Sequence, residues 1–83
     1  DAIEIILNKK WGLVKYSELA RNFNCSISDV IKSLGSEDGY TIYDDYNYTI
    51  AYNDRIKYKK RIAFTLFHEI GHIYLGHLID FRK

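Results

Sequence analysis

The sequence lacks features that would point to secretion or to a membrane. It has a single cysteine, Cys25, which excludes an internal disulfide, fits a reducing cytoplasmic location and is expected to be a small core residue. No apolar run reaches the roughly 20 residues that a membrane-spanning helix needs. The charged first residue Asp1 and the short apolar run after it do not resemble a signal peptide. We therefore expect no membrane partner.

An excess of charge of one sign is also lacking. The chain has 12 basic and 11 acidic residues, a net charge of +1, which gives no general attraction for nucleic acid or anionic lipid. Proline is absent, and no low-complexity linker or internal repeat is found. The length of 83 residues indicates one small domain, 1–83. Because the chain begins with Asp1, we expect it to be a fragment.

Residues 1–35 carry the signals of three short helices. Ser17 and Ser26 are suited to cap the starts of the second and third helices. Asn24 and Gly35 are suited to end those helices in the left-handed conformation. The residues expected to face the core from the first two helices are Ile3, Ile6, Leu7, Leu19, Ala20 and Phe23.

The pattern changes at "YTIYDDYNYTIAY", residues 40–52, where Tyr, Thr and Ile favour β-structure. We predict an antiparallel hairpin with strands at 40–43 and 48–52. A long helix is predicted over 58–79, with Asp54 suited to cap its start. Eight tyrosines and four phenylalanines are expected to supply much of the core. Short helices, a hairpin and a long helix predict an α+β fold.

The long helix contains "HEIGH". Because a helix turns about 100° per residue, His68 and His72 lie one turn apart on one face and can bind the same metal ion. Glu69 projects beside that pair, where a carboxylate can take a proton from a water that attacks a polarised carbonyl. Gly71 leaves room beside His72 for another element or for a substrate backbone. The pattern predicts a zinc hydrolase with His68 and His72 as ligands and Glu69 as general base.

A third ligand is not evident, although a catalytic zinc of this kind takes three protein ligands. His77 is nine residues beyond His68, so a continuous helix places it on the opposite side, and Asp80 is too far along the axis. We expect the third ligand to be absent from this chain. The alternative is that the histidines are ordinary surface or core residues that hydrogen-bond to their neighbours.

The segment "RIAFTLFHEIGHIYLGH", residues 61–77, resembles the signature of the ImmA/IrrE metallopeptidases of phages and mobile elements: Arg-x-x-Phe-Thr-x-x-His-Glu-x-Gly-His, then Leu-Gly-His. The resemblance implies a zinc peptidase acting on a protein substrate such as a transcriptional repressor. It implies His68 and His72 as ligands, Glu69 as base, and an acidic third ligand on a later helix. The chain is thus expected to be C-terminally incomplete. Arg61 is expected to anchor the helix through an ion pair.

Other functions stay open beside a peptidase. A catalytically inactive relative would serve as an interaction module that recognises a regulator without cleaving it. The segment "LARNFNCSISDVIKSL" has helix-turn-helix spacing, compatible with a winged-helix DNA-binding domain. Its second helix, however, carries Ile27, Asp29 and Ile31 where a groove-reading helix carries Arg, Lys, Asn or Gln. The apolar side of the long helix, uncovered without a further helix, predicts self-association.

Overall fold

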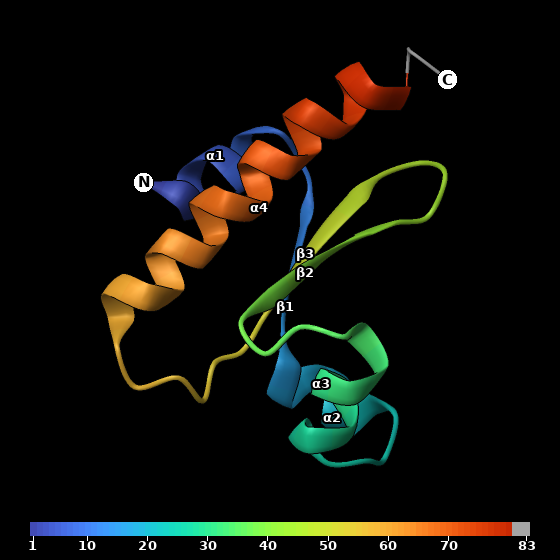
Figure 1. Cartoon of the computed structure of the whole chain (residues 1–83), viewed down its shortest axis with the longest axis vertical. Helices are drawn as coiled ribbons and strands as arrows, with labels where there is room; N and C mark the ends of the chain where they lie inside the picture. The colour runs from blue at the N-terminus through green and yellow to red at the C-terminus, as the bar shows by residue number, and fades with distance from the viewer. Residues whose placement is uncertain (81–83) are drawn as a thin grey trace.

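The fold combines short helices, a small sheet and one long helix, as the sequence predicts (Figure 1). The computed structural model describes the backbone of residues 1–80 and the side chains of residues 1–76. In chain order the elements are α1 (Ala2–Asn8), β1 (Gly12–Lys15), α2 (Tyr16–Asn22), α3 (Ile27–Leu34), β2 (Gly39–Tyr43), β3 (Tyr48–Tyr52) and α4 (Lys59–Asp80).

The sheet has the order β1-β3-β2, with β3 in the centre. β2 and β3 form the predicted antiparallel hairpin, whose turn is closed by Asp44: its Oδ1 accepts the backbone N–H groups of Tyr46 and Asn47 at 3.0 and 2.8 Å. The purely helical prediction for residues 1–35 is wrong at β1, which pairs in parallel with β3. Four residues are too few to show a strand period, and β1 is a strand because β3 lies beside it.

Capping explains the boundaries of the helix α3. Ser26 and Asp29 form a reciprocal capping box at its start, and Gly35 ends it with φ at +72°, as predicted. Asn24 has φ at +56° just beyond α2 and makes the sharp turn between α2 and α3. These short polar signals are local, so the sequence alone reveals them.

The predicted caps at Ser17 and Asp54 are wrong. α2 begins at Tyr16, and Ser17 lies in its first turn. Asp54 caps this helix instead of α4: its Oδ1 accepts the Ser17 N–H at 3.0 Å and its Oδ2 accepts the Ser17 hydroxyl at 2.6 Å. Burial alone would raise the pKa of Asp54, but these hydrogen bonds outweigh burial and hold that pKa below its usual range. The contact fixes the segment between β3 and α4 onto α2.

Two mainly aliphatic clusters, one on each face of the sheet, form the core. Ile50 and Ala51 are neighbours in β3 and point to opposite faces, as successive strand residues do. The cluster that involves α1 and α4 contains Ala2, Ile6, Ile50, Leu66, Ile70 and Ile73. The cluster that involves α2 and α3 contains Tyr16, Ala20, Val30 and Ala51.

The predicted aromatic core is wrong. Tyr16 is fully buried, whereas many other rings are exposed: Phe23, Tyr40, Tyr43, Tyr46, Tyr58, Phe64, Phe67 and Tyr74. Ile3, Leu7 and Cys25 are exposed as well, contrary to their predicted core positions. The reason is size: a chain this short buries a limited share of its surface, and the aliphatic residues of α4 and β3 already fill the space.

The helix α4 has 22 residues and differs by one residue at each end from the predicted range 58–79. It crosses one face of the sheet, with α1 beside it (Figure 1). No helix in the described part of the chain is long and apolar enough to cross a membrane. Because α4 packs on β2 and β3, it holds the histidine motif beside the sheet.

Candidate metal centre

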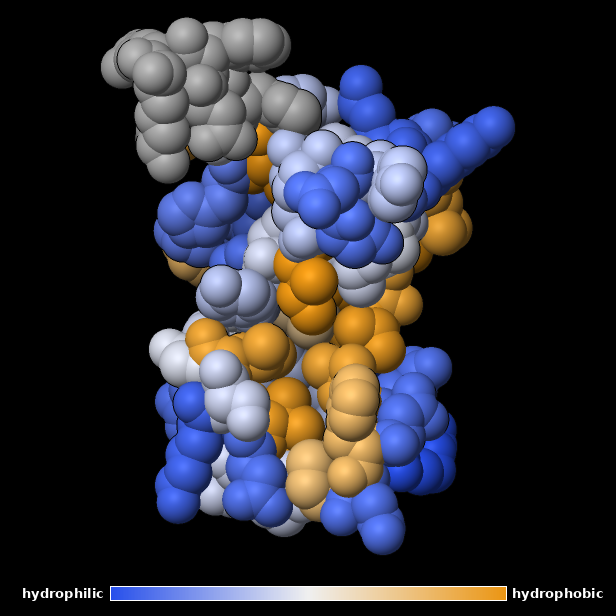
Figure 2. Space-filling view, turned by 90° about the vertical axis from the view of Figure 1, so that its right-hand side faces the viewer, coloured by the Kyte–Doolittle hydropathy of each residue, from blue (hydrophilic) through white to orange (hydrophobic). Residues whose placement is uncertain are grey.

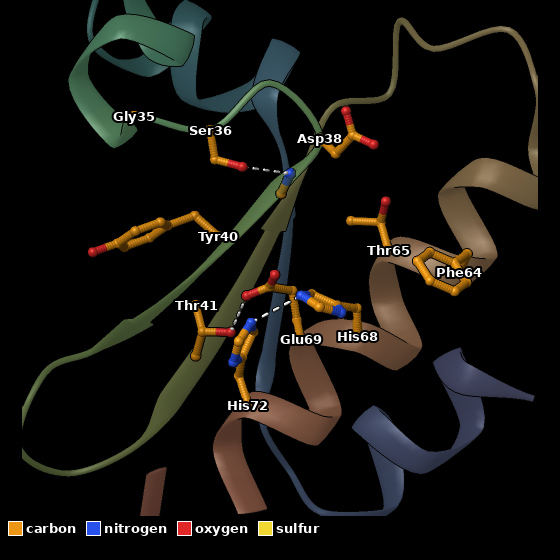
Figure 3. Close-up of a pocket in the computed structure, with 11 residues that line it drawn as sticks. Gly35, Ser36, Asp38, Tyr40, Thr41, Phe64, Thr65, His68, Glu69 and His72 are labelled. Carbon is orange, nitrogen blue, oxygen red and sulfur yellow. Dashed lines mark hydrogen bonds between the residues drawn. The ribbon is translucent and has the colours of Figure 1, made fainter. Parts of the chain in front are cut away.

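A groove of about 630 Å³ runs between α4 and the edge strand β2 (Figure 3). One wall is formed by the turn after α3 and the first half of β2, through Gly35, Ser36, Asp38, Gly39, Tyr40 and Thr41. The other wall is formed by Phe64, Thr65, His68, Glu69 and His72 of α4. The structure thus brings the three predicted site residues together in one open groove.

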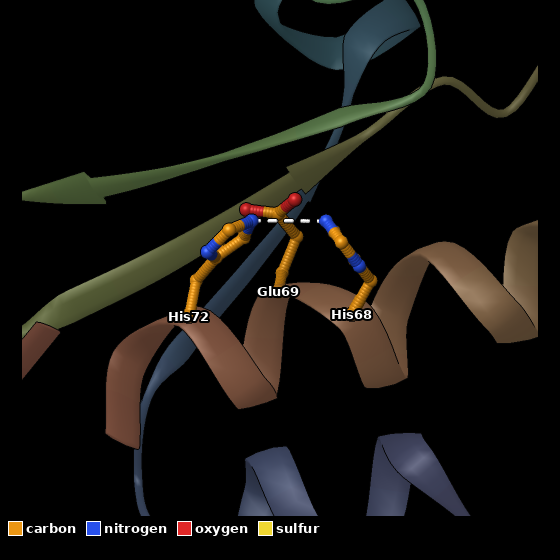
Figure 4. Close-up of side chains that lie close together, drawn as sticks. All are labelled: His68, Glu69 and His72. Carbon is orange, nitrogen blue, oxygen red and sulfur yellow. Dashed lines mark hydrogen bonds between the residues drawn. The ribbon is translucent and has the colours of Figure 1, made fainter. Parts of the chain in front are cut away.

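His68 and His72 face each other across one helical turn, as their spacing predicts (Figure 4). Their Nε2 atoms lie 2.9 Å apart, and the ring planes are nearly perpendicular at 88°. Both side chains are exposed, so an ion can reach them from solvent.

This pair fits a zinc ion. Two imidazole nitrogens on one tetrahedral zinc lie about 3.3 Å apart, given zinc–nitrogen bonds of about 2.0–2.1 Å. A small rotation of either ring opens the 2.9 Å separation of the Nε2 atoms to that value. One Nε2–H donates to the other ring in this contact. An ion held by both Nε2 atoms would replace this hydrogen bond and would require both ring protons on Nδ1.

Glu69 is the buried member of the group, with an exposed fraction of 8%. Its Oε1 accepts a hydrogen bond from the Thr41 hydroxyl at 2.7 Å. Ligand atoms of His68, Glu69 and His72 all lie within 4.8 Å of one another. The carboxylate therefore lies next to the two imidazole rings, in a position suited to a general base.

No further metal ligand is found among the side chains of residues 1–76, where these three residues form the only such group. Asp38 lines the groove but is engaged by an arginine. The predictions for His77 and Asp80 concern side chains outside the described ones. The backbone of α4 continues across Gly76 without a break, so the chain does not turn back toward the groove there.

Arg61 anchors α4 to the groove wall, which confirms its predicted ion pair. Its guanidinium binds Asp38 through both carboxylate oxygens, at 2.8 Å from Nε and 2.6 Å from Nη2. This hydrogen-bonded pair holds the pKa of Asp38 below its usual range. The buried Asn53 secures the same turn, because its side-chain amide donates to the Glu37 carbonyl at 2.9 Å. Residues distant in sequence thus fix the position of β2 against α4.

Comparison with known proteins agrees with this arrangement. The model of the IrrE N-terminal-like domain, a peptidase domain, matches residues 22–83, or 62 of the 83 residues. The chain belongs to the IrrE N-terminal-like family. This confirms the resemblance seen in the motif of α4 and extends it to α3 and the hairpin. Peptidases of this family are metal-dependent and act on proteins. No curated protein and no solved structure was found to match the chain.

The groove also depends on residues that sequence reasoning missed in this IrrE-like chain. Thr41 and Tyr40 line it from β2, and Asp38 lies at its end. The two-residue period of a strand puts the side chains of Thr41 and Tyr43 on the same face of β2, but it does not say whether that face packs on α4. Which face packs on α4 depends on the order of the strands in the sheet, and that order includes the unpredicted β1. The sequence therefore carries no local signal for Thr41.

Two glycines near the motif have different roles. A Cβ atom on Gly39 would lie 2.6 Å from Thr65 Cγ2 and 3.0 Å from the Ala51 carbonyl oxygen, so β2 approaches α4 closely only with glycine there. A Cβ atom on Gly71 would meet nothing within 4 Å among the described residues. Packing of another described element is therefore not the reason for Gly71, and the approach of a substrate backbone stays a prediction.

Opposite effects on stability are expected when these glycines are replaced by alanine. Gly39→Ala should lower the free energy of unfolding by about 1–3 kcal/mol, because the methyl group overpacks the contact with Thr65. Gly71→Ala should raise it by about 0.5–1 kcal/mol, because alanine is the better helix residue and its methyl group has room. Urea unfolding of the metal-free proteins measures both values. Equal stability of the two variants would contradict the close packing of β2 on α4.

The surface of α2 and α3 does not resemble a DNA-reading surface. Figure 2 shows apolar patches among polar surface at this end of the molecule. In this region Phe23 is exposed, and Ile27 and Ile31 are part-exposed. The exposed residues within α3 are Ser28, Asp29, Lys32 and Ser33. With one cation among them, α3 offers little to phosphate groups or base edges.

Proposed function

We propose that this protein is a zinc-dependent peptidase that hydrolyses a peptide bond of a regulatory protein, such as a transcriptional repressor. One observation carries the proposal: two imidazole Nε2 atoms 2.9 Å apart lie beside a buried carboxylate in an open groove. Membership of the IrrE N-terminal-like peptidase family supports it. A structural role for these histidines would not need an acid between them that faces the same groove.

In this proposal, the residues of the motif have separate tasks. His68 and His72 hold the zinc ion. Bound zinc polarises the scissile carbonyl and makes an attacking water more acidic. Glu69 removes the proton from that water and later delivers it to the leaving amine. The Thr41 hydroxyl donates a hydrogen bond to Oε1 of Glu69. Oε2 accepts no hydrogen bond from the described side chains, so it is the oxygen proposed to take the proton.

The substrate is proposed to bind along the outer edge of β2. The Asp38 carbonyl oxygen accepts the Asn53 N–H at 2.8 Å, so the pair of positions 38 and 53 is hydrogen-bonded across the hairpin. Antiparallel pairs alternate, so the backbone groups of Thr41 and Tyr43 point away from β3. An extended peptide can pair with these groups and so add a strand beside the motif.

The walls of the groove favour an apolar substrate side chain near the metal. Phe64 is 70% exposed and stacks on His68, with ring centroids 6.1 Å apart. Tyr40 also borders the groove, but its ring points away from Phe64, on the sheet face of its cross-strand partner Ala51 (Figure 3). The exposed ring of Phe64 can therefore cover an apolar substrate side chain that lies near His68.

The third metal ligand is expected from outside the described side chains. Two histidines and a nearby carboxylate bind zinc less firmly than a complete set of three ligands. This incompleteness favours one alternative: the groove binds a regulatory protein without cleaving it. The peptidase and the interaction module would use the same groove, but only the peptidase would hydrolyse the bound protein.

Hydrolysis of a mixture of unstructured peptides tests the proposal. With zinc supplied, mass spectrometry should detect cleavage beside apolar residues, because the exposed ring of Phe64 lies beside His68. A chelator should abolish cleavage, and added zinc should restore it. Peptide binding without cleavage would favour the interaction module, and cleavage that survives the chelator would contradict a metal peptidase.

Apolar side chains of α4 remain partly exposed, although Tyr74 contacts Trp11 and Phe67 lies beside α1. Phe67, Tyr74 and Leu75 are 49%, 47% and 58% exposed. Self-association through these side chains stays a prediction.

A further inference from the structure

Thr41 connects the edge strand β2 to the proposed base. Its hydroxyl donates to Glu69 Oε1 at 2.7 Å, although 28 positions separate the two residues in the chain. Glu69 is 8% exposed, so water has little access to compete for its carboxylate. Among the described residues, Thr41 is the one side chain that donates a hydrogen bond to this carboxylate.

We propose that Thr41 is a positioning residue: its hydroxyl fixes the carboxylate plane of Glu69 so that Oε2 faces the attacking water. The inference rests on the proposed peptidase function. The terminal torsion of a glutamate is broad, so the carboxylate rotates readily when nothing holds it. A hydrogen bond to a charged oxygen is strong where solvent is scarce, and one such bond can therefore select one orientation.

The backbone of Thr41 faces the outer edge of β2, where the substrate is proposed to pair. Its cross-strand partner Ile50 is fully buried in the core beneath α4, which limits movement of this part of β2. A peptide paired with the N–H and C=O groups of Thr41 restrains the residue further. Thr41 thus links the position of the substrate backbone to the orientation of the base.

The variant Thr41→Val removes the hydroxyl and keeps the shape of the side chain. We expect kcat to fall about 10- to 100-fold, since a displacement of about 1 Å can cost 10²-fold in rate. KM and zinc affinity should stay unchanged, and Thr41→Ser should restore most of kcat. Thr49→Val is the matched control: Thr49 lies in β3, opposite Ile42, on the sheet face away from α4, and should leave kcat unchanged.

Unfolding of the metal-free protein gives a readout that does not depend on activity. In the presence of Glu69, Thr41→Val should raise the unfolding equilibrium constant about tenfold or more, because a hydrogen bond to a charged group is lost. In a Glu69→Ala background, the same substitution should not raise it. This double-mutant cycle isolates the contact between the two side chains.

The outcomes separate positioning from the peptidase function itself. If Thr41→Val keeps the wild-type kcat while Glu69→Gln is inactive, the positioning role of Thr41 is overturned and the peptidase proposal stays intact. A parallel loss of kcat, zinc affinity and stability in both backgrounds would mark Thr41 as merely structural and would also overturn it. A wild-type protein without zinc-dependent hydrolysis would overturn both proposals. A selective loss of kcat, restored by serine, with coupled unfolding supports the inference.

Discussion

Glu69→Gln is expected to lower the rate of peptide hydrolysis by about 10²–10⁴-fold, the usual contribution of a general acid–base group. Glutamine keeps the size of the side chain and can still accept the Thr41 hydroxyl at Oε1. It cannot take a proton from water, because a neutral amide is not a base at ordinary pH. The imidazole nitrogens of His68 and His72, the proposed zinc ligands, are untouched, so zinc affinity should remain near the wild-type value. Single-turnover cleavage measures the rate, and competition with a chelating dye measures the affinity.

Glu37→Gln is the matched control for this substitution. It makes the same chemical change on a side chain that is 70% exposed and that contacts Arg61 at 3.4 Å, outside the groove. Exposed ion pairs contribute about 0–1 kcal/mol, so stability should change little and the rate should not change. Wild-type hydrolysis in the Glu69→Gln protein would remove Glu69 as the base.

His68→Ala and His72→Ala should each abolish stoichiometric zinc binding at micromolar zinc. Each substitution removes one of the two proposed ligands. Changes in residues that merely support a ligand cost about 10–100-fold in metal affinity, so loss of a ligand itself should cost more than about 100-fold. Equilibrium dialysis followed by elemental analysis measures the bound metal.

His77→Ala provides a comparison within the same sequence. His77 is nine residues beyond His68, and helical spacing predicts that it faces away from the pair. Zinc binding should therefore survive this substitution. Loss of zinc in His77→Ala, with retention in His68→Ala, would reverse the assignment of the ligands.

Signals confined to a few neighbouring residues were predictable from the sequence. The i, i+4 spacing of His68 and His72 determines their shared face before any tertiary contact is known. The capping box of Ser26 and Asp29 and the left-handed Gly35 set the limits of α3 in the same local way. In each case the residues that determine the feature lie within about one helical turn of one another in the sequence.

Features that depend on tertiary pairing were not predictable. The four residues of β1 become a strand by pairing with β3, and Asp54 caps α2 across 37 positions of chain. The contact of Thr41 with Glu69 likewise requires the register of β2 on α4. Phe23 is more apolar than Tyr16, yet Phe23 is exposed and Tyr16 is buried, so hydrophobic character alone could not separate them. The pairing of His68 with His72 was therefore predictable from the sequence, whereas the surroundings of Glu69 were not.

The imidazoles of His68 and His72 are proposed to bind one zinc ion together. X-ray absorption at the zinc edge of the zinc-loaded protein detects such binding directly, because imidazole rings give a characteristic scattering beyond the first shell. We expect two imidazole nitrogens at about 2.0–2.1 Å from the metal, with one fewer after His72→Ala. A spectrum without imidazole scattering, or one that is identical after His72→Ala, would rule out zinc binding by this pair.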